Sequence, residues 1–383
     1  MKKQFSNLHI AGFRRLREVD FSLQPLTVVI GANGVGKTSL LDVMSLLAAS
    51  AEGHLNDAIG GLSGISSLLT YDRADRLKIA LSMDMEGQEP IEYSIEITPS
   101  ALAYSIENEK LTQQRNNLSS PFKFIDSHLA DIRYYEKEDS KLQRPNWEHK
   151  QLESSLAQVP KMFEAPEHFR RALASSTLYH ALNVASRAPV RLPQPMGLVQ
   201  LPGKDGEDLV SCLYYLRETD RDRFESIEDT LRVAFPTFER LEFPPVAAGT
   251  MALAWKDRNF TRQLYAHQLS EGTLRFLWLA ALLHSPSLPA VTMIDEPEVS
   301  LHPEMLRLLA ELFREASQRT QLIVATHSDR LVRFLEPHEL AVMDLAEDGC
   351  TTIARADTFD LDAWLKDYAL DELWHMGRLG GRA

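Results

Sequence analysis

Cysteine is scarce in this chain of 383 residues, which has only Cys212 and Cys350. The two do not form a CxxC pair, so the sequence offers neither a disulfide framework nor a zinc site. The N-terminal stretch begins with two lysines but lacks the unbroken apolar segment of a secretory signal. No run approaches the roughly 20 apolar residues that cross a bilayer. We therefore expect a soluble, cytoplasmic protein with no membrane partner.

Positive charge is also in short supply. The 41 lysines and arginines stand against 54 aspartates and glutamates, which gives a net charge of −13. This balance argues against a uniformly basic nucleic-acid-binding protein but allows a local basic groove. The sequence has no internal repeats, no low-complexity segment and no sustained heptads, so it encodes no long coiled-coil arm.

Strand and helix patterns alternate in the C-terminal third, which is typical of a parallel α/β sheet. Nearer the N-terminus, alternating apolar and polar residues over 75–110 predict an antiparallel meander with turns at Gly87 and Pro99. The pattern from 121 to 190 is irregular and mixed helical. The other predicted elements are strands at 5–10 and 19–30, a helix at 37–49, a helix at 206–235, a strand pair over 238–256, helices at 273–283, 303–319 and 328–335, strands at 290–294 and 321–325, and a strand pair near 339–356.

A glycine-rich turn follows the apolar run LTVVI. Its sequence, GANGVGKTS at 31–39, matches the G-x-x-x-x-G-K-[ST] pattern and lies between a predicted strand and a predicted helix. In that context the glycines let backbone N–H groups turn inward around a phosphate. Lys37 would reach the terminal phosphates, and Thr38 would ligate Mg²⁺. The predicted nucleotide site also includes Asn33, Gly34, Gly36 and Ser39.

Two adjacent carboxylates end the apolar strand in AVTMIDEPEVSLHP, residues 290–303. Successive side chains of a strand point in opposite directions, so Asp295 and Glu296 can do different work. Asp295 is the expected partner of Mg²⁺, and Glu296 is expected to orient or deprotonate the attacking water. The strand in QLIVATHS ends at His327, where a parallel sheet places its ligands, and we predict that this histidine contacts the γ-phosphate.

The segment HQLSEGTLRF, residues 267–276, places a serine, an acidic residue and a glycine in front of a predicted helix. Ser270 is able to cap its own helix. The positive end of the helix dipole also suits an anion, although nothing nearby in the chain could be its ligand.

In their order along the chain, these four segments resemble ATP-binding-cassette ATPases of the SMC/RecF branch, a group often described as AAA-type. FRRLREVDFSL and DEPEVSLHP carry the same resemblance, which covers about 1–50 and 262–335. It implies ATP and Mg²⁺ as ligands, with Lys37, Glu296 and His327 serving hydrolysis. It also implies that Ser270 and Gly272 bind the γ-phosphate of ATP held by a second copy of the protein, so that ATP drives dimerisation.

The resemblance is incomplete at two positions. Members of the branch have a glutamine that contacts Mg²⁺, and no residue of this sequence is assigned that role. Arg14 resembles a basic residue near the nucleotide, and a solvated surface arginine is the alternative.

The resemblance implies an α/β ATPase head with a mixed or parallel sheet, an antiparallel β subdomain and an inserted helical lobe. We expect an N-terminal ATPase part over 1–120, the helical lobe over 121–235, and a C-terminal ATPase part with a short tail over 236–383. Three basic clusters of the lobe, FRRAL, RAPVR and RETDRDRF, are candidates for phosphate contacts. A solvated face of mixed charge is the alternative interpretation.

Three functions follow from these patterns. The first is a dimeric ATPase switch that acts in DNA transactions or anti-phage defence, with a separate effector such as a nuclease. The second is a RecF-like DNA clamp that needs no effector. The third is a nuclease that uses Asp360 and Asp362 of the tail, for which an ordinary turn is the simpler interpretation.

Overall fold

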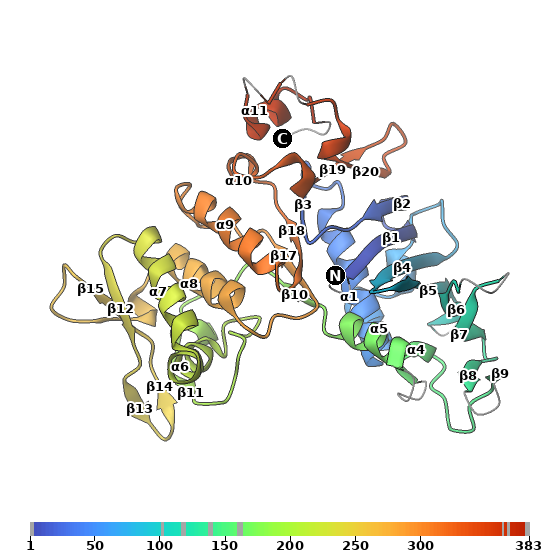
Figure 1. Ribbon diagram of the computed structural model, residues 1–383, viewed down its shortest axis with the longest axis horizontal. Coiled ribbons are helices and arrows are strands. Elements are labelled where there is room, and N and C mark those ends of the chain that lie inside the picture. Colours follow the sequence, from blue (N-terminus) through green and yellow to red (C-terminus); the bar gives the residue numbers. More distant parts are fainter. Residues whose placement is uncertain are drawn as a thin grey trace.

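A six-stranded sheet forms the centre of the molecule (Figure 1). The computed structural model describes residues 4–100, 103–115, 120–136, 141–158, 164–361, 364–365 and 368–379. All strands of the central sheet run parallel except the edge strand β20. In spatial order they are β10 (Thr177–Tyr179), β17 (Val291–Asp295), β18 (Gln321–Ala325), β3 (Leu26–Ile30), β19 (Leu340–Leu345) and β20 (Thr351–Arg355).

Both faces of this sheet are buried. Val28 and Val324 pack into one apolar core with the helices α8 (Glu271–His284) and α9 (Met305–Ser317). Their immediate neighbours in the strands, Val29 and Ile323, pack into a second core with α1 (Lys37–Glu52). Because both faces of the sheet are buried, the sequences of the central strands are continuous apolar runs. The parallel α/β arrangement predicted for this region is confirmed.

An antiparallel sheet lies beside α1, to the right in Figure 1. It confirms the predicted meander and extends it by three strands, over 122–128, 134–136 and 141–143, where the predicted mixed helical segment is wrong. The buried neighbours Phe124 and Ile125 break the alternation that would have identified a strand. Its strands are, in spatial order, β2 (Leu16–Ser22), β1 (Gln4–Phe13), β4 (Leu77–Met85), β5 (Gln88–Pro99), β6 (Tyr104–Gln113), β7 (Phe122–His128), β8 (Tyr134–Glu136) and β9 (Lys141–Gln143).

A lobe of helices and small sheets lies on the opposite side of the central sheet, to the left in Figure 1. The helix predicted over 206–235 is two helices, because Asp220 caps a new one by accepting a hydrogen bond from the N–H of Arg223 at 3.3 Å. Its helices are α6 (Leu209–Thr219) and α7 (Arg221–Ala234), and its sheets are β11 (Gln194–Pro195), β14 (Thr250–Met251) and β13 (Pro245–Ala247), then β12 (Phe238–Glu242), β15 (Ala254–Asp257) and β16 (Leu264–Tyr265).

Short helices complete the fold. The tail, at the top of Figure 1, packs against the helix that follows β18, with Trp374 fully buried. The remaining helices are α2 (Leu55–Gly61), α3 (Ile65–Leu68), α4 (Ser155–Gln158), α5 (Glu164–Ala174), α10 (Asp329–Val332) and α11 (Leu370–His375), with 3₁₀ turns at Pro189–Arg191, Ala266–Gln268, Pro337–Glu339 and Ala356–Thr358.

One buried side chain joins the two large sheets. The amide of Gln321, at the start of β18, accepts a hydrogen bond from the N–H of Phe5 at 3.0 Å. It also donates to the carbonyl oxygen of Phe5 at 2.7 Å, as a neighbouring strand would. Because Gln321 is buried, water cannot replace these bonds.

Replacing Gln321 with leucine should therefore destabilise the protein by about 2–4 kcal/mol, since two buried backbone groups lose their partners. Chemical denaturation measures the change. The exposed Gln318→Leu variant is the control and should shift the free energy of unfolding by less than about 0.5 kcal/mol. Equal effects in the two variants would contradict this role for Gln321.

Candidate functional site

Four strands of the central sheet end at the same edge, and the segments that follow them converge there. The register pairs Asp295 with Ala325 and Ala325 with Val29, so that β17, β18 and β3 finish level with one another. β10 finishes beside β17, with Tyr179 opposite Ile294. This edge is where open parallel sheets bind ligands.

The phosphate loop connects β3 to α1. Gly36 immediately precedes the helix with φ 107°, a left-handed conformation that other residues adopt only under strain. The ammonium of Lys37 lies inside the loop and donates to the carbonyl oxygens of Gly31 at 2.6 Å and Ala32 at 3.1 Å. Burial lowers the pKa of Lys37, and Glu296 opposes that shift. Asn33, Gly34 and Thr38 are exposed on the loop, whereas Ser39 is buried.

The acidic pair lies against this loop. The hydroxyl of Thr38 donates to Oδ2 of Asp295 at 3.4 Å, which brings together the two residues predicted to ligate Mg²⁺. Burial raises the pKa of Asp295, and the neighbouring charge of Glu296 adds to the effect. β17 ends at Asp295, and Glu296 follows it with a φ of 52°, in the left-handed region. The two carboxylates are therefore not on opposite faces of one strand, because Glu296 lies outside the strand. Our prediction of how they diverge was therefore wrong.

His327 faces Glu296, with 3.3 Å between Nδ1 and Oε1. The sequence analysis missed the residue that holds this pair, Glu298. Its Oε1 accepts hydrogen bonds from the hydroxyl of Thr326 at 2.6 Å and from the N–H of His327 at 3.3 Å. Burial raises the pKa of Glu298. In the sequence, only its place as the second glutamate of DEPE could have indicated this role. In the structure, Glu298 connects the loop after β17 to the loop after β18.

His180 is a second missed residue. It follows β10 directly, and its Nδ1 lies 3.7 Å from Oδ2 of Asp295. It therefore lies beside the predicted magnesium ligand. A three-residue strand gives almost no periodicity, so the sequence carried no usable signal for it.

Arg14 lies on the other side of α1. Its guanidinium contacts Oδ2 of Asp42 at 2.5 Å and donates to the hydroxyl of Ser39 at 3.4 Å. A cavity of about 400 Å³ opens beside it, lined by Tyr71 and Arg73 among others. Tyr71 is the most exposed aromatic side chain of the cavity, at 87%.

The segment before α8 is held within its own chain. Ser270 accepts a hydrogen bond from the N–H of Thr273 at 3.1 Å, so it caps its own helix, as one of our two interpretations expected. A Cβ at Gly272 would clash with the carbonyl oxygen of Ser300, in the loop that follows the acidic pair. Arg275 donates to the hydroxyl of Ser300 at 2.9 Å. In the described chain, no hydrogen bond joins Ser270 to the phosphate loop.

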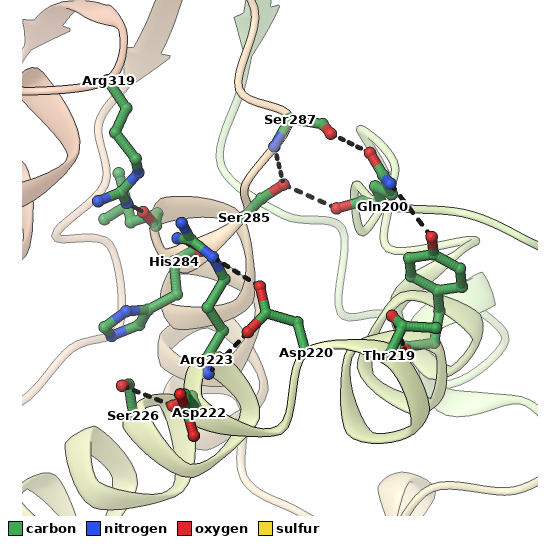
Figure 2. Close-up of polar contacts among 12 residues, drawn as sticks. Gln200, Thr219, Asp220, Asp222, Arg223, Ser226, His284, Ser285, Ser287 and Arg319 are labelled. Atoms are coloured by element: carbon green, nitrogen blue, oxygen red, sulfur yellow. Dashed lines mark hydrogen bonds and ion pairs between the residues drawn. The ribbon is translucent and has the colours of Figure 1, made fainter.

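Arginines hold α8 at both ends. Before the helix, the Nη1 atom of the Arg191 guanidinium donates to the carbonyl oxygens of Ala266 and His267 at 3.3 Å and of Leu269 at 3.0 Å. At the other end, Arg223 donates to the carbonyl oxygen of His284 at 3.1 Å (Figure 2). Arg319 donates to the preceding carbonyl, of Leu283. Cations suit a helix C-terminus, so α8 is fixed in place.

Most arginines of the predicted basic clusters are paired with acids, whereas the exposed Arg187 and the half-buried Arg191, both of the cluster RAPVR, are in no ion pair among the described residues. The guanidinium of Arg191 donates its hydrogen bonds to backbone carbonyl oxygens. In the other two clusters each arginine contacts an acid of its own helix or of a neighbouring turn. These ion pairs support the mixed-charge interpretation for FRRAL and RETDRDRF, and they do not test it for RAPVR. The pairs are Arg170 and Arg171 with Glu167, Arg217 with Glu218, Arg221 with Glu225, and Arg223 with Asp220.

The described part of the tail contains no candidate metal site. Among the described residues, no group of three or more histidine, cysteine, aspartate or glutamate side chains is placed to hold a metal ion. Asp360 is described, whereas Asp362 lies outside the described residues. No helix in the described ranges is long and apolar enough to cross a membrane.

Comparison with known proteins agrees with this geometry. A crystal structure of an Smc head bound to the C-terminal winged-helix domain of ScpA has 13% sequence identity and a TM-score of 0.58, covering 95% of this chain and 99% of that one. An Smc head domain with an extended coiled coil, bound to the C-terminal domain of ScpA from Pyrococcus furiosus, has 12% identity and a TM-score of 0.54, covering 95% and 98%. No curated protein matches the chain.

A family model described as "AAA domain, putative AbiEii toxin, Type IV TA system" matches residues 26–333. The match spans well over half of the chain and includes the phosphate loop, the acidic pair and His327. The structural similarity adds the fold of an SMC head, including the mixed sheet and the antiparallel subdomain predicted from the sequence. The protein therefore belongs to this AAA-domain family and has the fold of an SMC head.

Proposed function

We propose that the protein binds Mg·ATP and hydrolyses it between two copies of itself, and that the ATP-bound dimer is a switch for a separate effector. The observation that carries the proposal is the convergence of Lys37, the Thr38–Asp295 pair and the Glu296–His327 pair at one sheet edge. The matched family supports nucleotide binding.

The site residues divide the work of hydrolysis. The ammonium of Lys37 would turn from the loop carbonyls to the terminal phosphates. Glu296 would orient or deprotonate the attacking water, with His327 holding its carboxylate toward the γ-phosphate. Glu298, bound to the loop after β18, keeps that pair in register.

The oxygen ligands around Thr38 and Asp295 fit Mg²⁺, which supplies positive charge to the phosphates when it is bound. The buried Asp295 has a raised pKa because of desolvation and the charge of Glu296, and a divalent cation relieves both effects. The cavity lined by Arg14 and Tyr71 is large enough for the base, and Arg14 connects it to α1 by donating to Ser39.

The second copy supplies Ser270 and Gly272. Within one chain this segment caps α8 and makes no bond to residues 31–39, so its exposed helix N-terminus is available to another molecule's γ-phosphate. Two-fold symmetry then gives two composite sites. The related Smc heads are seen bound to ScpA, which supports the idea that such heads act on a separate protein.

We place this switch in the cytoplasm, in DNA transactions or anti-phage defence, with an effector such as a nuclease. The toxin–antitoxin description of the family supports the defence role. A RecF-like DNA clamp without an effector is the alternative, and ATP-dependent DNA binding by the isolated protein would favour it. For a nuclease built from the tail aspartates, nothing among the described residues provides support.

Replacing Glu296 with glutamine should leave ATP binding intact and lower the rate of hydrolysis at least about 100-fold, because the water loses its base. Phosphate release and calorimetric ATP binding measure the two effects. Lys37→Ala, in contrast, should lose binding itself. Hydrolysis at the wild-type rate by Glu296→Gln would show that the role assigned to Glu296 is wrong.

Replacing His180 with alanine should raise the Mg²⁺ concentration for half-maximal ATPase activity about 10-fold, because Asp295 loses a neighbour that positions it. The matched control is His338→Ala, since its side chain is equally exposed and lies elsewhere, beside Glu336. If both variants require the same Mg²⁺ concentration, His180 has no part in the site.

A further inference from the structure

The hairpin between β15 and β16 exposes an aromatic ring between two arginines. Residues 258–262 are all exposed, and Phe260, in the middle of the turn, has 54% of its surface accessible. Arg258 and Arg262 stand on either side of it in sequence. The ring of Phe260 is therefore accessible to a ligand, and its position between two arginines distinguishes it from a single exposed apolar side chain.

The positive charge around Phe260 is uncompensated. Within the described chain, Lys256, Arg258 and Arg262 have no ion pair, unlike the arginines of the basic clusters on α5 to α7. The ammonium of Lys256 donates to the carbonyl oxygens of Phe260 at 3.0 Å and Thr261 at 3.1 Å. Those bonds hold the turn in shape and leave the charge in place, in a chain whose net charge is −13.

A groove runs from this turn across the small sheet. It has a volume of about 440 Å³, and Lys256, Arg262 and Tyr265 line it. Arg240 and Glu242 also line it and form an ion pair, with 2.6 Å between them, and Arg240 contacts Glu239 at 2.6 Å as well. The groove therefore offers two cations and the ring of Tyr265, and the turn with Arg258 and Phe260 adjoins it at Thr261 and Arg262.

We propose that this hairpin surface, formed by Lys256, Arg258, Phe260, Arg262 and Tyr265, binds single-stranded nucleic acid. Guanidinium and ammonium groups contact the phosphates, and an unstacked base lies on the ring of Phe260. A single strand is favoured over a duplex because only an unpaired base presents its face to such a ring. An acidic peptide would match the charge but gains nothing from the exposed aromatic ring.

The bound strand lies next to the segment that would contact ATP. Tyr265 stacks on His267, with 6.0 Å between ring centroids and 7° between the planes. Arg191 donates hydrogen bonds to the carbonyl oxygens of Ala266, His267 and Leu269. These bonds hold the segment that connects the groove to Ser270. This part of the inference rests on the proposed function: a bound strand changes the ATPase rate by acting on the segment before α8.

The test is fluorescence anisotropy with labelled 20-nucleotide oligo(dT) and oligo(U), without ATP, over a range of salt concentrations. Arg258→Ala/Arg262→Ala should bind at least about 10-fold more weakly, and the slope of log K against log salt should shrink by about 1.4, or 0.7 for each lost phosphate contact. Phe260→Ala should weaken binding about 5- to 100-fold with an unchanged slope, because it removes stacking alone. The arms with DNA and RNA show which strand is preferred.

The control variant, Arg221→Ala/Arg307→Ala, removes two exposed arginines that sit in ion pairs and should bind like the wild type. Thermal melting confirms that all variants are folded. Absence of binding by the wild type at 50 mM salt, or equal affinity in all variants, would overturn the proposal. So would equally tight binding of a 20-residue polyglutamate together with no effect of Phe260→Ala.

The ATPase assay separates this inference from the proposed function. Oligo(dT) or oligo(U) should change the wild-type ATPase rate at least about twofold and leave the hairpin double variant unaffected. A protein that binds the strand but hydrolyses no ATP would contradict the proposed function and leave the binding site standing. An unchanged rate in an active enzyme would overturn only the coupling to Ser270.

Discussion

The parallel pairing of β10, β17, β18 and β3 is the constraint on which the site depends. Parallel strands of equal register end at one edge, so the residues after them are brought together although they are nearly 300 positions apart in sequence. The pairing is stable because apolar side chains alternate between two cores, one with α1 and one with α8 and α9. A shift of one residue would exchange these faces and separate Thr38 from Asp295.

The position of α8 is the second constraint, and it connects the two halves of the proposed composite site. Gly272 permits close packing on Ser300, which follows the acidic pair, while Arg191, Arg223 and Arg319 hold the ends of the helix. The acidic pair and the helix N-terminus of one chain therefore move together. A second copy that binds ATP at this helix would transmit the nucleotide state of one molecule to the other.

Local sequence was sufficient where a single segment carries both the element and its chemistry. The phosphate loop, α1 and the strand before Asp295 were predicted because their periodicity and glycines lie within a few residues. Residues whose role depends on distant partners were missed. The role of His180 depends on Asp295, on the neighbouring strand of the sheet. Two interpretations of the basic clusters stayed open, because a count of arginines does not show which acid each one contacts. The strands over 122–143 were missed because neighbouring buried residues hide the alternation.

The most direct test of the account is the mass of the Glu296→Gln protein in solution, measured by light scattering with and without Mg·ATP. The account predicts a monomer that doubles in mass when Mg·ATP is added, and no doubling when Ser270→Arg is combined with it, because the bulky cation blocks the second copy's helix N-terminus. A protein that binds ATP but keeps a constant mass would contradict the composite site. So would ATP-driven doubling that survives Ser270→Arg.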